Sequence, residues 1–332
     1  MKKPFNQASY LAQVRRLKIL AQKALAEYPI RVKSIHFIQH GENATFRVQA
    51  AHGQTFLLRV HRQGYHSKSA IIEEMRWLRR LVRDGFFVPN PVLSNGRRLV
   101  ETVETADTGS RNCTVLEWVH GRFIGKSVKP RHMFEVGRLL AQFHNHTSNN
   151  KVIHRRYWTA EGLVGETPKF GALNQVKALS TSQRKVLLEA RKTVFTKLRK
   201  YEKKYPNRQG LIHADLHFGN FLSSGGRLGA IDFDDCGYGF FVYDLVIPYI
   251  SLQRVLGTRK KSVLLEYKNA LIEGYKTERK WTNEDEALFP YLVAARRIMM
   301  IGWLNSRSDN PRLRRHLKGA FKEVVRYLKE LE

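Results

Sequence analysis

The spacing of apolar residues divides the chain into two parts of different character. In the first part, apolar positions recur close to the helical period over residues 8–27 and again over 68–83. Short apolar or alternating runs predict strands at 32–39, 45–50, 55–61 and 114–119. Asn95 and Gly96 form a turn dipeptide between short strand candidates and predict a hairpin there. Residues 1–119 are therefore expected to form a sheet with one inserted helix, preceded by an N-terminal helix.

In the second part, apolar residues recur at the helical period over longer stretches of sequence. Helices are expected at 131–146, 181–205, 260–276, 283–306 and 311–331. Loop and strand interrupt them at 211–235. The pattern predicts an α+β protein with a small N-terminal antiparallel-sheet lobe (1–119) and a larger, mainly helical C-terminal lobe (120–332). A length of 332 residues is sufficient for two such lobes.

The charge changes this picture only at the surface. A formal net charge of +29 and a pI near 10.3 would suit an anionic partner. The basic residues are spread along the chain at helical intervals, which favours solvated helix faces over a dedicated binding surface. No zinc-finger spacing or aromatic RNA-binding strand accompanies them. An anionic partner is possible, but no specific nucleic-acid motif is present.

Two cysteines, Cys113 and Cys236, are too few for a disulfide framework and lack metal-ligand spacing. The start of the chain has a basic tip but no apolar stretch after it, so it does not resemble a signal peptide. The apolar window at 242–252 is too short to span a bilayer. We expect a soluble, cytoplasmic protein with no membrane span.

The segment 211–235, LIHADLHFGNFLSSGGRLGAIDFDD, carries the candidate chemistry. Four residues separate Asp215 from Asn220, the spacing of the catalytic loop in protein kinases. In that loop the Asp accepts the proton of the attacking hydroxyl and the Asn holds a metal ion on the phosphates. Asp232 follows a short apolar strand, like the kinase Asp that binds magnesium. Each residue alone would more simply be a cap or a turn former. Together, at this spacing, they favour a catalytic role.

The motifs HADLHFGN and AIDFDDCGYGFFVYDL resemble those of the aminoglycoside phosphotransferase and choline kinase superfamily. GENATFRV, FLLRVHRQGYHS, IIEEMRWLRRL, VLEWVHGR and GRLLAQFHNHT extend the resemblance over most of the chain, and it is nearest to the bacterial branch with homoserine-kinase-like members. Ala214 stands where this family usually has Gly, and Phe218 where Pro is frequent. The resemblance implies a protein-kinase-like bilobal fold and an enzyme that uses ATP and Mg²⁺.

The resemblance assigns roles to the residues of the loop segment. Asp215 would be the base that deprotonates the acceptor hydroxyl, and Asn220 and Asp232 would bind magnesium. His213 and Asp244 would support the loop, with Asp244 bonding its backbone from the next helix.

For the nucleotide, the resemblance implies a second group of residues. Arg59 stands at the usual position of a lysine that contacts the α- and β-phosphates, and Glu74 would be its ion-pair partner. Since a guanidinium is always charged and grips oxygens in pairs, phosphate binding is compatible with Arg59. Asn43 belongs to the hairpin that would cover the phosphates. Glu117 and Val119 would offer backbone groups to the adenine.

The acceptor is the least determined part. Arg296, Arg297, Trp303 and Arg307 are spaced to share or neighbour one helix face and could bind an anionic group, although simple surface coverage is slightly favoured. A protein of charge +29 would repel polycationic aminoglycosides at long range. We therefore expect a small hydroxylated metabolite, homoserine-like or an amino alcohol. An aminoglycoside phosphotransferase, a protein Ser/Thr kinase and a noncatalytic anion- or nucleic-acid-binding module are the alternatives.

Overall fold

The structure is a computed structural model that describes residues 3–147, 154–168, 170, 173, 176, 179–257, 261–307 and 317–329. Contacts group the chain into two compact units. The first runs through Arg122 and also takes up residues 154–155 and the segment Phe221–Asp234. The second takes up the remaining residues. The expected division into 1–119 and 120–332 stays a prediction, and the contact division differs from it chiefly in Phe221–Asp234.

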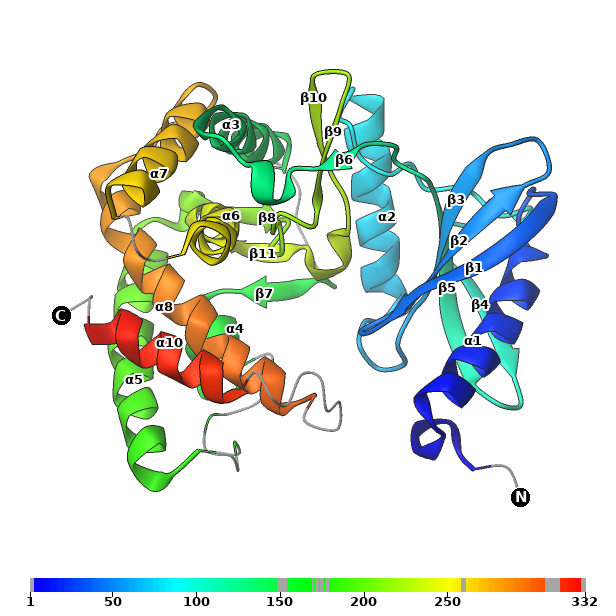
Figure 1. Ribbon diagram of the computed structural model, residues 1–332, viewed down its shortest axis with the longest axis horizontal. Coiled ribbons are helices and arrows are strands. Elements are labelled where there is room, and N and C mark those ends of the chain that lie inside the picture. The colour runs from blue at the N-terminus through cyan, green and yellow to red at the C-terminus, as the bar shows by residue number, and fades with distance from the viewer. Residues whose placement is uncertain are drawn as a thin grey trace. The chain divides into compact units, whose positions relative to one another are not determined.

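An antiparallel five-stranded sheet forms the centre of the first unit (Figure 1). Its strands, in spatial order, are β1 (Val32–His40), β2 (Ala44–Ala50), β3 (Thr55–Val60), β5 (Gly109–Glu117) and β4 (Glu101–Thr105). In this register Arg59 on β3 lies opposite Thr45 on one side and Thr114 on the other. The predicted N-terminal antiparallel-sheet part is confirmed, and Arg59 belongs to the central strand of the sheet.

Two helices complete this unit, together with a short 3₁₀ turn, η1 (Phe5–Gln7). α1 (Tyr10–Leu25) begins at Ser9, whose hydroxyl accepts from the amide of Ala12, and its buried face joins the sheet core. α2 (Lys68–Arg83) has the bounds that the sequence predicted and begins at Ser67. Its buried face carries one carboxylate, Glu74, among apolar residues.

The prediction of a β-hairpin at Asn95 and Gly96 is wrong. The turn there is closed by a bond from the Ser94 amide to the Arg98 carbonyl, and the Asn95 amide bonds to Glu27 at the end of α1. It joins no pair of strands. The hairpin in this region is β4–β5, which turns between Thr105 and Gly109. An Asn-Gly pair favours a tight turn but does not decide whether strands flank it.

The segment Phe221–Asp234 adds the hairpin β9 (Phe221–Ser224) and β10 (Arg227–Ala230) to the first unit. The glycines of its turn, Gly225 and Gly226, have positive φ angles of 54° and 77°. The short 3₁₀ turn η5 (Phe233–Asp235) follows. β6 (Arg122–Phe123) lies where the chain passes from the first unit to the second.

The second unit is mainly helical, as expected (Figure 1). Its helices are α3 (Pro130–Thr147), α4 (Ala160–Val164), α5 (Thr181–Lys204), α6 (Phe241–Leu256), α7 (Lys261–Lys276), α8 (Asn283–Asn305) and α10 (Leu317–Lys329), with 3₁₀ turns η2 (Gly125–Ser127) and η4 (Pro206–Arg208). A small sheet, in the order β7 (Arg156–Trp158), β11 (Gly237–Phe240), β8 (Gln209–Ile212), lies among them. The ends of the helix predicted at 311–331 fall outside the described residues.

α8 is the one described helix that is long and apolar enough to cross a membrane. However, 67% of its most apolar window is buried inside the structure, as in the core helix of a soluble protein. The apolar window at 242–252 lies within α6. α8 begins with a capping box between Thr282 and Asp285, so it has the start signal of an ordinary globular helix.

α3 and α7 approach each other closely because each has a glycine at the crossing. A methyl group on Gly137 would overlap with the carbonyl oxygen of Leu271, and one on Gly274 with that of Phe134. Backbone at these positions leaves no room for a side chain.

We predict that Gly274→Ala lowers the free energy of unfolding by about 2–3 kcal/mol, since the two helix backbones must separate. The matched control is Gly319→Ala on α10, where an added methyl group meets nothing within 4 Å. That substitution should instead stabilise the protein by up to about 1 kcal/mol. Urea denaturation of the two variants measures the difference, and equal effects would contradict this packing argument.

Candidate active site

The loop between β8 and β9 is held by one buried carboxylate. Asp244, in the first turn of α6, accepts hydrogen bonds from the backbone amides of His213 (2.8 Å) and Ala214 (2.6 Å). Its side chain is fully buried. The expected contact of Asp244 with the loop backbone is therefore confirmed. Because a buried carboxylate is costly without donors, these bonds fix where the loop begins.

His144 on α3 completes this network, and sequence reasoning did not identify it. Its Nε2 lies 3.1 Å from Asp244 and its Nδ1 lies 3.0 Å from the Tyr275 hydroxyl on α7. Burial lowers the pKa of His144, so the ring is neutral, donates to the carboxylate and accepts from the tyrosine. In the sequence, His144 is a histidine on the apolar side of a predicted helix. Any hydrogen-bonded histidine in a protein core has the same pattern, so the pattern does not indicate the contact with Asp244.

Ala214 adopts a left-handed conformation, with φ of 68°. Asp232 does the same, with φ of 64°. Such angles are strained for residues with a side chain and cluster at functional sites. Ala214 is the position where the resembling family usually has Gly, and the bonds from the amides of His213 and Ala214 to Asp244 hold the backbone that enters this strained turn.

Asp215, the expected base, follows directly and is engaged by an arginine. The Nη2 of Arg296 on α8 lies 2.6 Å from Asp215 Oδ1, and Arg296 Nη1 donates to the Tyr243 hydroxyl at 3.1 Å. Burial alone would lower the pKa of Arg296, but Tyr243 and Asp215 raise it, so the guanidinium stays charged. Burial raises the pKa of Tyr243 to about 12. The side chain of Asp215 keeps 25% exposure.

Asn220 and His213 hold the other side of Asp215. The Asn220 side-chain amide donates to the Asp215 carbonyl at 2.9 Å. The Asp215 amide donates to His213 Nδ1 at 3.3 Å, so His213 supports the loop through its ring. Its ring is fully buried. The loop thus presents one partly exposed carboxylate on a backbone bonded at several points.

Of the expected acceptor group of Arg296, Arg297 and Trp303, the two arginines have different partners. Arg297 donates to Gln253 and forms an ion pair with Glu323 on α10, away from Asp215. Acceptor binding by these residues stays a prediction. Of the three, Arg296 has the contact that bears on chemistry.

In the first unit, the predicted ion pair of Arg59 and Glu74 is present, with 2.7 Å between Arg59 Nη1 and Glu74 Oε1. Arg59 Nη2 also donates to Asp232 Oδ1 at 3.0 Å. Burial would lower the pKa of Arg59, but its neighbouring carboxylates, Glu74 foremost, raise it above its ordinary value. One buried guanidinium therefore joins α2 to the Asp232 turn.

Arg155 is a second cation of this cluster that sequence reasoning missed. Its Nη1 lies 3.5 Å from Glu74 Oε2, and its Nη2 donates to the carbonyls of Phe233 and Asp234. Trp77 on α2 packs edge-on against Phe233 at 5.1 Å between ring centroids. Glu74 thus lies between two arginines, and the backbone after Asp232 is held by both a cation and an aromatic contact.

The other residues expected at the nucleotide lie on the first unit. Asn43 is buried and its Oδ1 accepts from the Arg62 amide, so it closes the β1–β2 turn onto the end of β3. Glu117 ends β5, where its amide donates to the Asn90 carbonyl. Val119 follows two residues after the end of β5 and is half-buried. Nucleotide contacts of these residues stay predictions.

Asp232 and Asn220 each carry an oxygen of the kind that a hard divalent cation prefers, and their binding of one Mg²⁺ stays a prediction. The Asp232 side chain is 44% exposed while Arg59 fixes its orientation. The amide nitrogen of Asn220 is used within the loop, which leaves its oxygen end for a cation. Carboxylate and amide oxygens are the ligands that Mg²⁺ prefers. The described residues include no cluster of three histidine, cysteine or acidic side chains suited to a metal, so any ion here would rely on further ligands.

Residues 34–281 match the model of the phosphotransferase enzyme family. The chain belongs to this family. It is therefore a phosphotransferase with a protein-kinase-like fold, an enzyme that acts on an alcohol group of a small molecule, and the family and fold expected from the sequence are confirmed.

Among characterised relatives of this phosphotransferase is amicoumacin kinase of Bacillus subtilis (strain 168), 27% identical over 308 residues that cover 88% of this chain and 85% of the relative. A homoserine kinase of Neisseria meningitidis is 39% identical over 82 residues, 24% of this chain and 26% of the relative. The structure of a microcompartment-associated aminopropanol kinase superposes with a TM-score of 0.79 and 30% identity, covering 95% of this chain and 98% of the other. An amicoumacin kinase in complex with AMP-PNP, Ca²⁺ and Ami has the same TM-score at 24% identity, with 95% and 94% coverage.

Two buried histidines of this phosphotransferase predict acid sensitivity. Burial, with Arg59 beside it, lowers the pKa of His61 to about 3, and burial lowers that of His144. Both pKa values lie below that of an unfolded histidine. Since the pKa of His61 in the folded chain is near 3, only the unfolded chain takes up the His61 proton between pH 6.5 and 5, and the effect of His144 has the same sign. The free energy of unfolding should then fall, as pH falls through this range, by up to about 1.4 kcal/mol per pH unit for His61, and His144 should add to this fall.

Urea denaturation of the His61→Gln variant at several pH values measures this slope. In the His61→Gln variant, the part of the pH slope of the free energy of unfolding that His61 supplies should disappear. His52→Gln, at an exposed turn, is the control and should keep the wild-type slope. A slope that both variants change equally would contradict burial as the cause.

Proposed function

We propose that this enzyme transfers the γ-phosphate of ATP, with Mg²⁺, to the hydroxyl of a small amino alcohol or homoserine-like acceptor. The observation that carries the proposal is the fixed carboxylate of Asp215, on a loop whose backbone bonds to the buried Asp244. Phosphoryl transfer needs little covalent help from the protein, because positioning and charge stabilisation supply most of the rate. A rigid, partly exposed carboxylate is suited to orient an alcohol and accept its proton.

The remaining roles follow from the two clusters. Asp215 accepts the proton of the acceptor hydroxyl, and Arg296 keeps one of its oxygens in place. Arg59 fixes Asp232 and adds positive charge for the nucleotide phosphates. Mg²⁺ held by Asn220 and Asp232 would offset the negative charge of the transferring phosphate. We also infer a cytoplasmic location, where ATP is present and the thiols of the two buried cysteines remain reduced.

An amino alcohol is favoured over the other acceptors. The aminopropanol kinase shares 30% identity with this chain over nearly its whole length, and the homoserine kinases act on another small hydroxylated amine. The net charge of +29 disfavours encounter with polycationic aminoglycosides. A protein Ser/Thr kinase and a noncatalytic binding module lack comparable support.

An acceptor screen tests this function. We expect Mg²⁺-dependent ADP release with 1-amino-2-propanol, ethanolamine or homoserine, and little with kanamycin or with a protein substrate such as casein. Release with kanamycin alone would replace the proposed acceptor class.

Asp215→Asn is the control within the screen. It should lower kcat by roughly 10²–10⁴-fold, since proton transfer is lost, while Kd for ATP stays within a few-fold of the wild-type value. Unchanged kcat would remove Asp215 as the base.

The contact between Arg296 and Asp215 gives a second prediction. Arg296→Ala should lower kcat by about 10–100-fold, the range expected for loss of a charged hydrogen bond, with a small change of KM for ATP. Added guanidine should restore part of the activity of Arg296→Ala and none of that of Asp215→Asn. Circular dichroism checks that the variant folds. A loss that appears only in KM for the acceptor would assign Arg296 to acceptor binding instead.

A further inference from the structure

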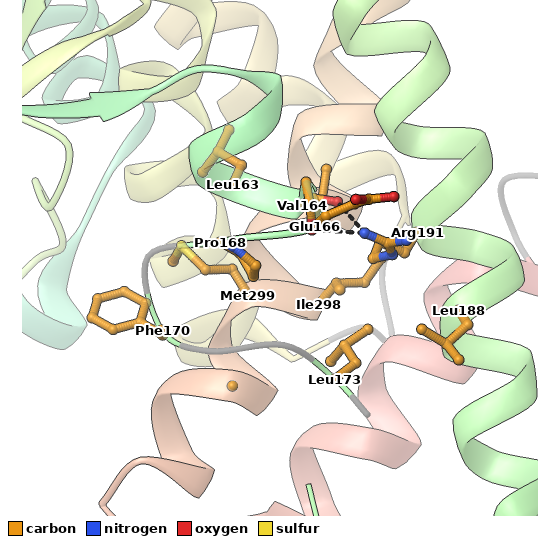
Figure 2. A pocket seen from close by; sticks show the side chains of 12 residues that line it. Leu163, Val164, Glu166, Pro168, Phe170, Leu173, Leu188, Arg191, Ile298 and Met299 are labelled. Carbon is orange, nitrogen blue, oxygen red and sulfur yellow. Dashed lines mark hydrogen bonds between the residues drawn. The ribbon is translucent and has the colours of Figure 1, made fainter. Parts of the chain in front are cut away.

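A cavity of ≈330 Å³ lies between α4, α5 and α8 of the second unit (Figure 2). The guanidinium of Arg191 in its wall donates to the carbonyls of Val164 and Gly165, as the dashed lines show. This cation is therefore used to join α5 to the end of α4. A smaller cavity of the same unit has a wall richer in positive charge.

The smaller cavity, of ≈150 Å³, is lined by residues of η4, the first turn of α6, the end of α7 with the turn after it, and the start of α8. Its lining combines three aromatic residues with three cations: Phe241, Tyr275, Trp281, Arg208, Arg279 and Lys280. A cavity of about this volume holds a benzene ring. The lining thus suits a small molecule that has both an apolar body and a negative charge.

One carboxylate, Asp285, also lines the cavity, but its oxygens already have donors. Its Oδ2 accepts from Arg208 and from the Thr282 hydroxyl, and its Oδ1 accepts from the Tyr201 hydroxyl. Asp285 therefore offsets the charge of Arg208 and caps α8. It leaves the charges of the other two cations unbalanced.

Arg279 and Lys280 form no ion pair with a carboxylate among the residues that the structure describes. Arg279 donates to the side-chain oxygen of Asn145 at 2.8 Å and lies over the Phe241 ring, 4.2 Å from its centroid. The two cations are adjacent in the sequence and border one cavity, so they repel each other. An anion bound by both would remove this repulsion and gain charged hydrogen bonds.

Contacts join the wall of this cavity to the catalytic loop. The ring of Phe241 lies 4.6 Å from that of His144, measured between centroids. The Tyr275 hydroxyl lies 3.0 Å from His144 Nδ1, and the other ring nitrogen contacts Asp244. Asp244 in turn accepts from the two loop amides that precede Asp215. Two aromatic residues of the wall therefore contact the histidine that orients the buried carboxylate of the loop.

We propose that this pocket binds a small organic anion and that the bound anion stabilises the catalytic loop. The ligand class is a carboxylate or phosphate monoester on a compact apolar body, with the negative group on Arg279 and Lys280 and the body against the aromatic wall. Such an anion holds the ends of α6 and α7 together around His144, so the loop amides bonded to Asp244 open less often. The ligand is an effector and is not phosphorylated.

Calorimetric titrations with benzoate, phenyl phosphate, acetate and inorganic phosphate test the binding. Benzoate or phenyl phosphate should bind at least about tenfold more tightly than acetate or inorganic phosphate, because the ring buries apolar surface. The tighter of the two ring-bearing anions identifies the carboxylate or the phosphate as the group that the cations recognise. Equal affinity for all four anions, or no binding, would overturn the proposal.

Lys280→Gln and Lys276→Gln are matched variants for the pocket. Lys280 borders the cavity, whereas Lys276 lies four residues earlier, outside the lining, and pairs with Glu273. Lys280→Gln should raise Kd for the tighter anion by about tenfold, as expected for the loss of a charged hydrogen bond. Lys276→Gln should keep Kd within about twofold of the wild-type value. Equal changes would mean that the anion responds to net charge and not to this pocket.

Amide hydrogen exchange tests the effect on the loop. Exchange of the backbone at 211–220 should slow by about fivefold or more when the pocket is saturated, the range of ordinary coupling between two sites. Tyr275→Phe keeps the ring in the wall and removes the hydroxyl that contacts His144. This variant should bind the anion with nearly unchanged Kd and lose most of the slowing.

Binding without slower exchange, or slowing that Tyr275→Phe keeps in full, would overturn the coupling. Neither measurement uses phosphoryl transfer. A failed acceptor screen would therefore leave this pocket standing, and absence of anion binding would leave the proposed reaction standing.

Discussion

The second unit depends on the burial of a single carboxylate, that of Asp244. An ionised carboxylate without donors would be excluded from the interior, so its position requires donors from several elements at once. It takes two from the loop backbone and one from His144, whose other nitrogen is used by Tyr275. α3, α6, α7 and the start of the catalytic loop are therefore coupled through one group. Since no member can leave without exposing an unpaired polar atom, the network specifies the loop conformation more sharply than apolar packing would.

The first unit also has a buried carboxylate at its centre. Its partners are two charged arginines, whereas those of Asp244 are backbone amides and a neutral histidine. Glu74 is fully buried between Arg59 and Arg155, and burial raises its pKa while both arginines oppose that rise. Breaking such a buried group by removing one partner is far more costly than the net stability that the intact group supplies. Its value lies in geometry. It fixes α2 relative to β3 and holds the turn at Asp232 in a strained conformation that the backbone alone would not favour.

Hydrophobic periodicity predicted the fold class and most helices and strands. The short motifs predicted that Asp215, Asn220 and Asp232 lie in one loop-and-strand segment between helices. They could do so because helix faces and loop lengths are local properties of the chain. The contacts of Arg155, His144 and Arg296 could not be predicted in the same way. Each of these residues contacts a partner more than 70 residues away in the sequence. The residues around it in the sequence are the same as those around an exposed arginine or an ordinary core histidine. Asn95 and Gly96 show the same limit, since their turn was correctly predicted and its flanking strands were not.

Arg59 illustrates how such a distant contact changes the meaning of a substitution. From the sequence alone, the arginine at the position of the family's usual lysine is expected to change the group that contacts the nucleotide phosphates. In the structure, the guanidinium uses one nitrogen for Glu74 and the other for Asp232. A single ammonium is a point charge without this fork and could not hold both carboxylates in fixed directions. Arg59 is thus compatible with a site in which the orientation of Asp232 is set before any nucleotide arrives, because both of its contacts join it to carboxylates of the same unit.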